Sequence, residues 1–304
     1  MKLLITGASG LLGLNLALEA ASAHEVVAVD RGKLVNPPFQ VVKGFLLAPG
    51  AVDSILDAVR PDWLIHCAAL ADLEACEDDP SLARRLNADL PGQIASACVQ
   101  RGISLVHIST DAVFDGQKDG AYTENDAPKP LGVYAQTKLD GERAVLDVNP
   151  GAIVARVNFY GWSPTGKRSL AEFFFHNLTN NKSMSGFTDV VFCPMLVNHL
   201  TQILLTMLQK GLSGLYHVVG DQAMSKYQFG VEIARKFRLP ESEISPKSIL
   251  SSSLTARRSH NLWLSTRKLS TDLGRPLPNF STGLNEFYTQ YQQGYPQKIR
   301  SYLH

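Results

Sequence analysis

The sequence predicts an α/β fold, in which a doubly wound parallel sheet is followed by a smaller, mostly helical unit. Short apolar runs alternate with longer segments of helical periodicity over the first half of the chain, which is typical of parallel strands with crossover helices. The rhythm changes after about residue 160, where helical patterns dominate. The 304 residues, 45% of them hydrophobic, can bury a large core and exceed the usual size of one compact unit.

The predicted strands of the first half are short, apolar and bounded by polar residues. They cover residues 2–6, 25–30, 40–45, 63–67, 104–109 and 152–157. The predicted helices between them cover residues 11–22, 51–59, 80–101 and 132–146. Strands and helices that alternate in this way form βαβ units, so we expect helices on both faces of the sheet.

In the second half we predict helices at residues 170–180, 194–210, 226–237 and 283–292 and a strand at 215–220. The Pro- and Ser-rich piece 240–253 predicts a loop or connector. We therefore divide the chain into a sheet domain, residues 1–160, and a smaller unit, residues 161–304. This division leaves room for segments of the second half to return to the sheet.

Charge and cysteine content narrow the function classes. Lys and Arg number 29 against 28 Asp and Glu, which gives no reason to expect nucleic acid or a membrane surface as partner. The four cysteines, at positions 67, 76, 98 and 193, lack metal-binding spacing, and we see no secretion signal. We therefore expect a cytoplasmic protein with reduced thiols, without a metal site or a membrane span. The oligomeric state stays open, a homodimer included.

The stretch TGASGLLG follows the first predicted strand and places Gly7, Gly10 and Gly13 ahead of an apolar helix. Glycines let the backbone approach a pyrophosphate, and the helix N-terminus offers free N–H donors. A tightly packed strand-to-helix turn is the alternative, since the spacing is GxxGxxG rather than GxGxxG. The position after the first strand favours dinucleotide binding in a Rossmann-type domain, with Leu11 and Leu12 also at the cofactor.

Asp30 ends the second predicted strand, where a carboxylate binds the adenosine ribose hydroxyls and repels a 2′-phosphate. This favours NADH, whereas the neighbouring Arg31 leaves NADPH open unless it is only a solvated surface charge. The residues that follow the fourth strand are Cys67, Ala68, Ala69 and Leu70. They stand at the carboxyl edge of the sheet, where ligands of open α/β folds bind, so we include them in the cofactor site.

The fifth strand ends in Ser109, Thr110 and Asp111 at the same edge of the sheet, and Tyr134 and Lys138 follow on one face of a predicted helix. A tyrosine, whose ordinary pKa is about 10, exchanges a proton near neutral pH only if its anion is stabilised, which an ammonium does. Alone, a tyrosine and a lysine four positions apart are more often a solvated helix face. Here the preceding loop and strand end favour a carbonyl-reduction site.

Four stretches together carry a family resemblance: TGASGLLG, STDAVFDG, YTENDAPKPLGVYAQTKLDGE and RVNFYG. They resemble the extended short-chain dehydrogenase/reductases, and within these the dTDP-4-dehydrorhamnose reductase family. The resemblance implies hydride transfer from NADH or NADPH to the 4-keto group of a nucleotide-linked deoxysugar, dTDP-4-dehydro-L-rhamnose being the first choice. It implies that Tyr134 delivers the proton, that Lys138 lowers the tyrosine's pKa and holds the nicotinamide ribose, and that Thr110 orients the ketone.

The resemblance also assigns the substrate to Asp111, Phe159 and Arg258, within the smaller unit and at the sheet edge. Some positions depart from the family pattern. Ala112 stands where a tyrosine is usual, Met195 stands where a threonine is usual, and ARRSHNLWL replaces an Arg-Pro-x-Asn pattern. The adjacent arginines 257 and 258 either hold a diphosphate or are solvated. These departures leave the sugar nucleotide open.

Other functions are compatible with parts of the sequence. A dehydratase would place an acid pair after Thr110, but Asp111 is followed by an alanine, which favours simple reduction. An epimerising reductase would need a further acid and base, for which Cys193, His107 and His199 are loose candidates.

The main alternative from another class is a non-catalytic regulatory subunit that resembles the methionine adenosyltransferase beta subunit. Its tail, residues 290–304 here, would then bind a catalytic partner; otherwise the tail is a last helix and a frayed end.

Overall fold

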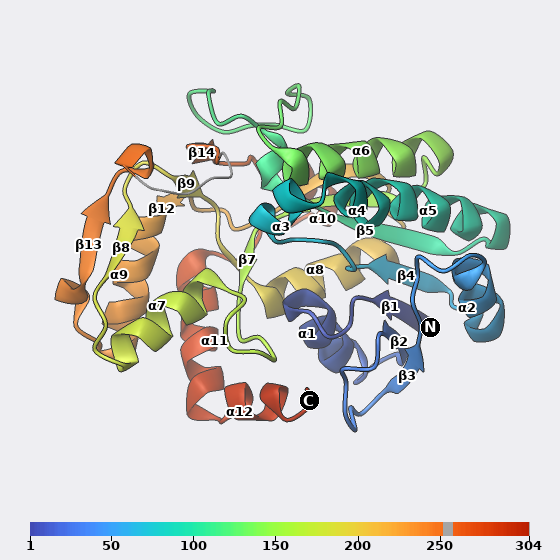
Figure 1. Cartoon of the computed structure of the whole chain (residues 1–304), viewed down its shortest axis with the longest axis horizontal. Coiled ribbons are helices and arrows are strands. Elements are labelled where there is room, and N and C mark those ends of the chain that lie inside the picture. The colour runs from blue at the N-terminus through green and yellow to red at the C-terminus, as the bar shows by residue number, and fades with distance from the viewer. Residues whose placement is uncertain (252–257, 304) are drawn as a thin grey trace.

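A computed structural model describes residues 1–251 and 258–303 of the chain. Figure 1 shows a large sheet domain and a smaller unit side by side, and the chain passes from one to the other more than once. Within the described residues no helix is long and apolar enough to cross a membrane.

The predicted doubly wound parallel sheet is confirmed. Among the described residues it has seven strands, in the order β11 (Gly214–Val218), β6 (Ile153–Val157), β5 (Ser104–Thr110), β4 (Trp63–His66), β1 (Lys2–Thr6), β2 (Glu25–Asp30) and β3 (Gln40–Lys43). All pairs are parallel. The chain runs outward from β1 in one direction and from β4 in the other, so the sheet has its switch point between these two strands. The strand predicted near residue 215 is β11, the edge strand of this sheet.

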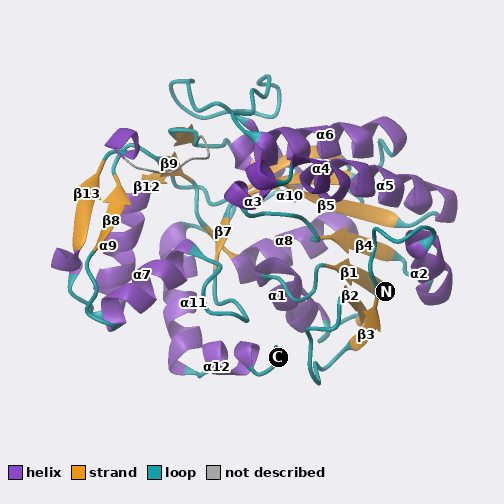
Figure 2. Ribbon diagram, viewed as in Figure 1, coloured by secondary structure: helices purple, strands orange, loops and turns teal. Residues whose placement is uncertain are grey.

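Helices cover both faces of the sheet, as Figure 2 shows. One face packs against α1 (Leu11–Ala20), α8 (Val197–Gln209) and α10 (Arg267–Leu273). The other packs against α2 (Ala51–Val59), α5 (Leu90–Arg101) and α6 (Val133–Val148). The central strands are therefore buried on both sides, which explains why their sequences are continuously apolar.

The region predicted as one helix at 80–101 is interrupted. It consists of α4 (Pro80–Arg84), the π-helical turn η1 (Arg85–Asp89) and α5, and the short helix α3 (Leu73–Asp78) precedes it. π-helical turns are rare and often mark functional sites. A further short turn, the 3₁₀ helix η2 (Asp111–Val113), follows β5.

The smaller unit combines helices with very short strands. Its helices are α7 (Leu170–Thr179), α9 (Lys226–Phe237), α11 (Phe280–Gln292), α12 (Tyr295–Arg300) and the 3₁₀ turns η3 (Glu241–Glu243) and η4 (Ile249–Ser251). Its strands are β7 (Phe159–Tyr160), β8 (Met184–Phe187), β9 (Val191–Phe192), β10 (Met195–Leu196), β12 (Met224–Ser225), β13 (Ile244–Lys247) and β14 (Asn261–Leu262). An aromatic cluster forms its core, in which the rings of Trp162 and Phe287 stack 4.1 Å apart.

The prediction of a loop or connector at 240–253 is wrong in part. Residues 244–247 form β13, which pairs in parallel with β8, and Ile244 is buried against the aromatic cluster. Burial of this single apolar side chain fixes an edge strand that its Pro- and Ser-rich neighbours conceal. Residues 252 and 253 lie outside the described part of the chain.

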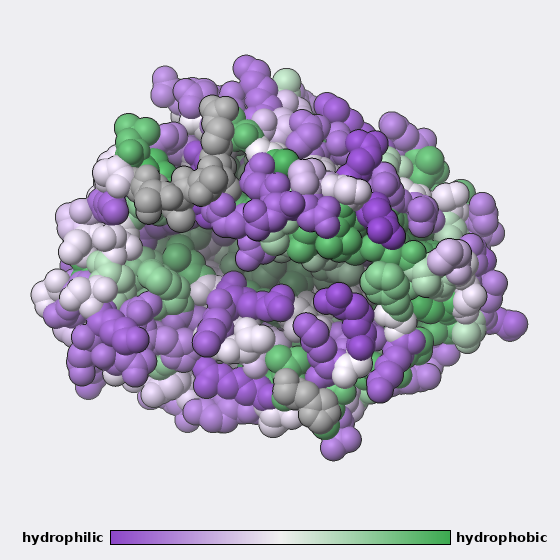
Figure 3. Space-filling view, viewed as in Figure 1, coloured by the Kyte–Doolittle hydropathy of each residue, from purple (hydrophilic) through white to green (hydrophobic). Residues whose placement is uncertain are grey.

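Figure 3 shows that the face of the molecule is hollowed between the two units. The carboxyl ends of the parallel strands lead toward this hollow, where β5 is followed by η2 and β6 by β7.

Candidate active site

The loop that joins β1 to α1 depends on glycine. Gly7 has a φ of +69°, and a Cβ on it would lie 2.7 Å from the Ala68 backbone nitrogen; a Cβ on Gly13 would lie 2.3 Å from the Gly7 oxygen. Gly10 is the N-cap of α1 and donates its own N–H to the Gly7 carbonyl at 3.0 Å. Because no side chain caps α1, its first N–H groups remain available to an anion.

Leu11 and Leu12, which we predicted to lie at the cofactor, begin α1 directly after the glycine loop. Both side chains are buried in the core between α1 and the sheet, so only their N–H groups face the loop. The loop therefore has the shape and the donors that a pyrophosphate requires, and the side chains of the helix anchor it from behind.

Asp30 lies at the end of β2 and is almost completely buried. Its Oδ1 accepts hydrogen bonds from the backbone N–H groups of Gly32 at 2.8 Å and Lys33 at 2.6 Å. Burial alone would raise its pKa, but these bonds and one from the Ser9 side chain hold the pKa of Asp30 below its ordinary value. The carboxylate is therefore ionised and held by its own loop, whereas Arg31 is exposed.

Residues 67–70 lead from β4 across the switch point. Ala68 donates its N–H to Thr6 Oγ1 at 3.2 Å, which places it against the glycine loop. Ala69 is exposed and Leu70 is half-buried. Burial raises the pKa of Cys67 to about 12, although the ammonium of Lys138 opposes the rise, so this thiol is neutral and unreactive at neutral pH.

Thr110 and Tyr134 meet at the end of β5. A hydrogen bond joins their hydroxyl groups, and the Thr110 hydroxyl also donates to Asp111 Oδ1 at 3.2 Å. Burial raises the pKa of Tyr134 to about 12, with the nearby Asp111 adding to the rise. The tyrosine is therefore protonated at neutral pH, which is the form that can give a proton to a ketone oxygen.

Lys138 lies one helical turn after Tyr134 and is buried. Its ammonium donates to the backbone carbonyl of Ile108 in β5 at 2.6 Å and lies 3.5 Å from His107 Nε2. Burial lowers the pKa of Lys138 to about 8. The ammonium thus fixes α6 to the strand that carries Thr110, and its expected effect on the tyrosine pKa stays a prediction.

Asp111 belongs to a charged cluster that joins the end of β5 to the smaller unit. Asn158 donates to Asp111 Oδ2 at 2.5 Å, and burial raises the pKa of Asp111 to about 6. The ammonium of Lys226, the first residue of α9, faces this carboxylate and also the guanidinium of Arg258. Arg258 in turn lies 3.6 Å from Glu74 of α3, so it bridges from the smaller unit to the sheet domain.

Residues 1–293 match the family described as the RmlD substrate binding domain. The chain belongs to this family. Its resemblance to the extended short-chain dehydrogenase/reductases and to the dTDP-4-dehydrorhamnose reductases is thereby confirmed.

Individual relatives of this RmlD-type chain differ in what they do. It is 33% identical over 237 residues to a probable low-salt glycan biosynthesis reductase, Agl14, of Haloferax volcanii, covering 77% of this chain and 79% of the relative. It is also 33% identical over 293 residues to methionine adenosyltransferase 2 subunit beta of Mus musculus, covering 94% and 86%. The crystal structure of a dTDP-4-dehydrorhamnose reductase from Clostridium acetobutylicum superposes with a TM-score of 0.83 at 26% identity, covering 96% of this chain and all of that one.

Asn87 was missed by sequence analysis. It is fully buried in the π-helical turn, and its amide both accepts from the Leu70 N–H at 2.9 Å and donates to the Leu70 carbonyl at 3.0 Å. The same amide donates to Thr137 Oγ1, one residue before Lys138. Asn87 therefore ties the segment after β4 to helix α6, which carries Tyr134 and Lys138. The signal available in the sequence was an asparagine on the apolar face of the helix predicted at 80–101.

A column of buried side chains below Lys138 was also missed. The rings of His66 and His107 stack with centroids 5.6 Å apart, and His66 Nδ1 lies 2.7 Å from Thr6 Oγ1. Burial and then Lys138 lower the pKa of His66 to about 3 and that of His107 well below its ordinary value, so both rings are neutral. Only the register of the sheet brings these residues together.

Ser109, Cys193 and His199 each have a partner that gives them a structural role. Ser109 donates to Glu142, which also binds Arg156 through two hydrogen bonds of 2.9 and 2.7 Å, so this group fixes α6 to β5 and β6. Burial raises the pKa of Cys193 to about 12, and His199 lies 2.8 Å from Glu286.

Phe159 is half-buried in β7, directly after β6 and beside Asn158. Arg257 lies outside the described residues. In the part of the chain that is described, no group of at least three His, Cys, Asp or Glu side chains is placed to hold a metal ion.

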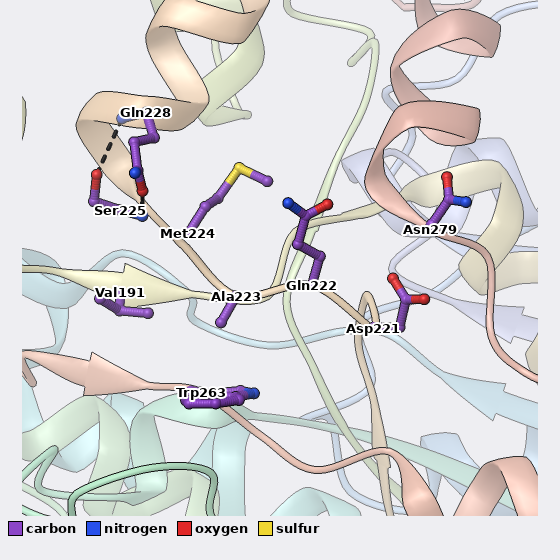
Figure 4. A pocket seen from close by; sticks show the side chains of 9 residues that line it. All are labelled: Val191, Asp221, Gln222, Ala223, Met224, Ser225, Gln228, Trp263 and Asn279. Atoms are coloured by element: carbon purple, nitrogen blue, oxygen red, sulfur yellow. Dashed lines mark hydrogen bonds between the residues drawn. The ribbon is translucent and has the colours of Figure 1, made fainter.

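A pocket of about 600 Å³ lies in the smaller unit beside the start of α9. Figure 4 shows Gln222, Asp221 and Asn279 around it, with the indole of Trp263 on the opposite side. Trp263 is 41% exposed, unlike Trp63 and Trp162, which are buried. The pocket thus offers a flat aromatic face and several amide groups.

Proposed function

We propose that this chain is an NADH-dependent reductase of the 4-keto group of a nucleotide-linked deoxysugar, most specifically dTDP-4-dehydro-L-rhamnose. The observation that carries the proposal is the hydrogen bond between Thr110 and a protonated, half-buried Tyr134 at the sheet edge that also holds the glycine loop. Membership of the RmlD-type family supports the same reading.

The donor set fits a dinucleotide. The tight turn at Gly7 and Gly13 and the uncapped start of α1 would hold the pyrophosphate, and Asp30 would bind the adenosine ribose. A reduced nicotinamide bound along this edge supplies a hydride. Lys138 would hold the neighbouring ribose by its ammonium, which already lies at the carboxyl end of β5.

The protein's own part of the reaction is to orient the ketone and to give a proton. Tyr134 would donate a hydrogen bond to the carbonyl oxygen, and Thr110 would turn its hydroxyl from Asp111 to donate to the same oxygen, so that negative charge developing there is stabilised. Tyr134 then transfers its proton to the oxygen and completes the alcohol. Asn87 and Lys138 keep the tyrosine helix in place relative to β5.

NADH is the cofactor we expect. Asp30 is ionised and its carboxylate would repel a 2′-phosphate, while Arg31 is exposed. The substitution Asp30→Ala should therefore weaken NADH more than NADPH. An equal loss of affinity for both cofactors would mean that Asp30 does not bind the ribose hydroxyls.

The nucleotide half of the substrate has matching chemistry in the smaller unit. The cations of Lys226 and Arg258 would bind the diphosphate, and the pocket with Trp263 and its amides would take the base. Titration with dTDP should quench tryptophan fluorescence, and Trp263→Phe should remove the quench. A quench that persists in this variant would place the base elsewhere.

A regulatory subunit is the second candidate, because the beta subunit of mouse methionine adenosyltransferase 2 is 33% identical over 94% of this chain. The deciding experiment follows loss of reduced-nicotinamide absorbance when the purified protein meets NADH or NADPH and dTDP-4-dehydro-L-rhamnose. Turnover supports the reductase. Cofactor binding without turnover of this or other nucleotide keto-sugars, together with co-purification of a transferase, would support the regulatory subunit instead.

A further inference from the structure

The C-terminal end of the chain returns to the cofactor edge of the sheet domain. Helix α12 follows α11 and is anchored by Ile299, which is fully buried, and by Tyr295, whose hydroxyl donates to Asn15 Oδ1 of α1 at 2.8 Å. Figure 1 shows the red end of the chain below α1 and beside the blue loop that follows β2. The tail therefore packs on its own chain.

The last described residues pair with that loop through backbone. Val35 donates its N–H to the Tyr302 carbonyl at 3.0 Å, and Leu34 and Leu303 form an antiparallel bridge. The side chains of Leu34 and Tyr302 pack against the same aromatic cluster as Tyr295. Backbone pairing and apolar packing thus join two segments that are far apart in sequence.

The same loop, residues 31–35, also binds the side chain of Asp30. Its carboxylate accepts hydrogen bonds from the backbone N–H groups of Gly32, Lys33 and Leu34. Gly32 has a φ of +99° and Asn36 has a φ of 45°, so the loop turns sharply at both ends of the segment that pairs with the tail. Hydrogen-bonded residues therefore connect the carboxylate of Asp30, which would bind the ribose, to the C-terminal tail.

We propose that residues 301–303, held in place by α12, form a strap that positions the loop 31–35 and thereby sets the affinity of Asp30 for the adenosine ribose of NADH. The strap is a positioning element, because it acts through Asp30 and not on the cofactor itself. The proposal rests on the proposed function, since it assumes that NADH binds at this edge. It predicts that the tail contributes to cofactor choice, a property that the motif region alone does not reveal.

The experiment compares the full chain with a variant that ends after Ser301, which removes the Tyr302 carbonyl and Leu303 but keeps α12. Titration by nicotinamide fluorescence measures NADH and NADPH affinity, and thermal melting measures stability. We expect NADH affinity to fall about five- to tenfold, the effect of losing about one backbone hydrogen bond with its packing. NADPH affinity should fall less, and the melting temperature should stay within a few degrees. Tyr302→Phe, which keeps the carbonyl, is the matched control and should bind NADH like the full chain.

A double-mutant cycle with Asp30→Ala tests whether the strap acts through this carboxylate. If it does, truncation lowers NADH affinity in the wild-type background and has little further effect in the Asp30→Ala background. Equal losses in both backgrounds, or a loss that accompanies a large drop in melting temperature, would overturn the positioning role. A full chain that binds neither cofactor would overturn the proposed function and the strap together, whereas normal NADH binding by the truncated chain would overturn the strap alone.

Discussion

Gly13→Ala tests the cofactor loop sharply, because the structure opposes the ordinary preference of a helix. Gly13 lies inside α1, where alanine is favoured over glycine by about 1 kcal/mol. In this chain a Cβ there would lie 2.3 Å from the Gly7 oxygen, whereas ordinary contact begins at 3.4 Å. The two atoms must therefore separate by about 1 Å, the difference between these distances.

Gly7 cannot yield freely. Its φ of +69° and its approach to the Ala68 backbone leave no room on the side of β4, and its carbonyl accepts the Gly10 N–H. Overpacking of this kind costs about 1 to 3 kcal/mol, which exceeds the gain in helix propensity. A shift of about 1 Å in a binding loop lowers function on the order of 100-fold. We therefore expect Gly13→Ala to lower NADH affinity by about that factor and the melting temperature by a few degrees.

The assay is NADH titration by fluorescence beside a thermal melt. Gly92→Ala in α5 is the matched control, because its Cβ would meet Ala144 of the neighbouring helix α6, with the methyl nearest at 3.1 Å and the backbone no closer than 3.8 Å. This control should bind NADH like the wild type. Gly13→Ala protein that is folded and binds NADH within about twofold of wild type would refute the assignment of this loop to the pyrophosphate.

Three further predictions concern the edge that carries Tyr134. Asn87→Ala should lower the free energy of unfolding, measured by urea titration, by about 2 to 4 kcal/mol, because it leaves the Leu70 backbone groups unpaired. The control Asn177→Ala on α7 should change this free energy little. Lys226→Met should raise the KM for the sugar nucleotide about tenfold with kcat and NADH affinity unchanged, as loss of one charge-assisted contact would; an unchanged KM would exclude this contact. The turnover rate should fall as the pH rises through about 8, because Lys138 loses its proton there, and Lys138→Arg, which stays charged, should shift this fall to higher pH. A rate that is flat from pH 7 to 10 would show that the ammonium is not needed.

The sequence alone predicted those parts of the site whose positions follow from the order of the strands along the chain. Glycines after the first strand, an acidic residue at the end of the second and a hydroxyl at the end of the fifth all meet at one edge once the strands are parallel. The Tyr134 and Lys138 pair gained its meaning from that edge. Since a helix of regular period carries both residues, their relative placement needed no tertiary information.

Other features depend on contacts that no local pattern contains. Asn87 falls on the apolar face of its helical segment, but its partner Leu70 is known only from the fold. His66 and His107 look like ordinary strand residues until the register stacks them below Lys138. The pairing of Leu34 with Leu303 spans almost the whole chain, so propensity and periodicity could not predict it.

Hydride transfer to a sugar ketone with Tyr134 as proton donor is tested most directly by isotope. The purified protein is incubated with NADH that carries deuterium at both nicotinamide C4 positions and with dTDP-4-dehydro-L-rhamnose, beside Tyr134→Phe protein shown to bind NADH. The sugar nucleotide is then analysed by mass spectrometry. We expect one deuterium in the wild-type product and none in the variant reaction. Equal labelling by both proteins would remove Tyr134 from the reaction, and no labelling by either, with NADH bound, would contradict the proposed reductase.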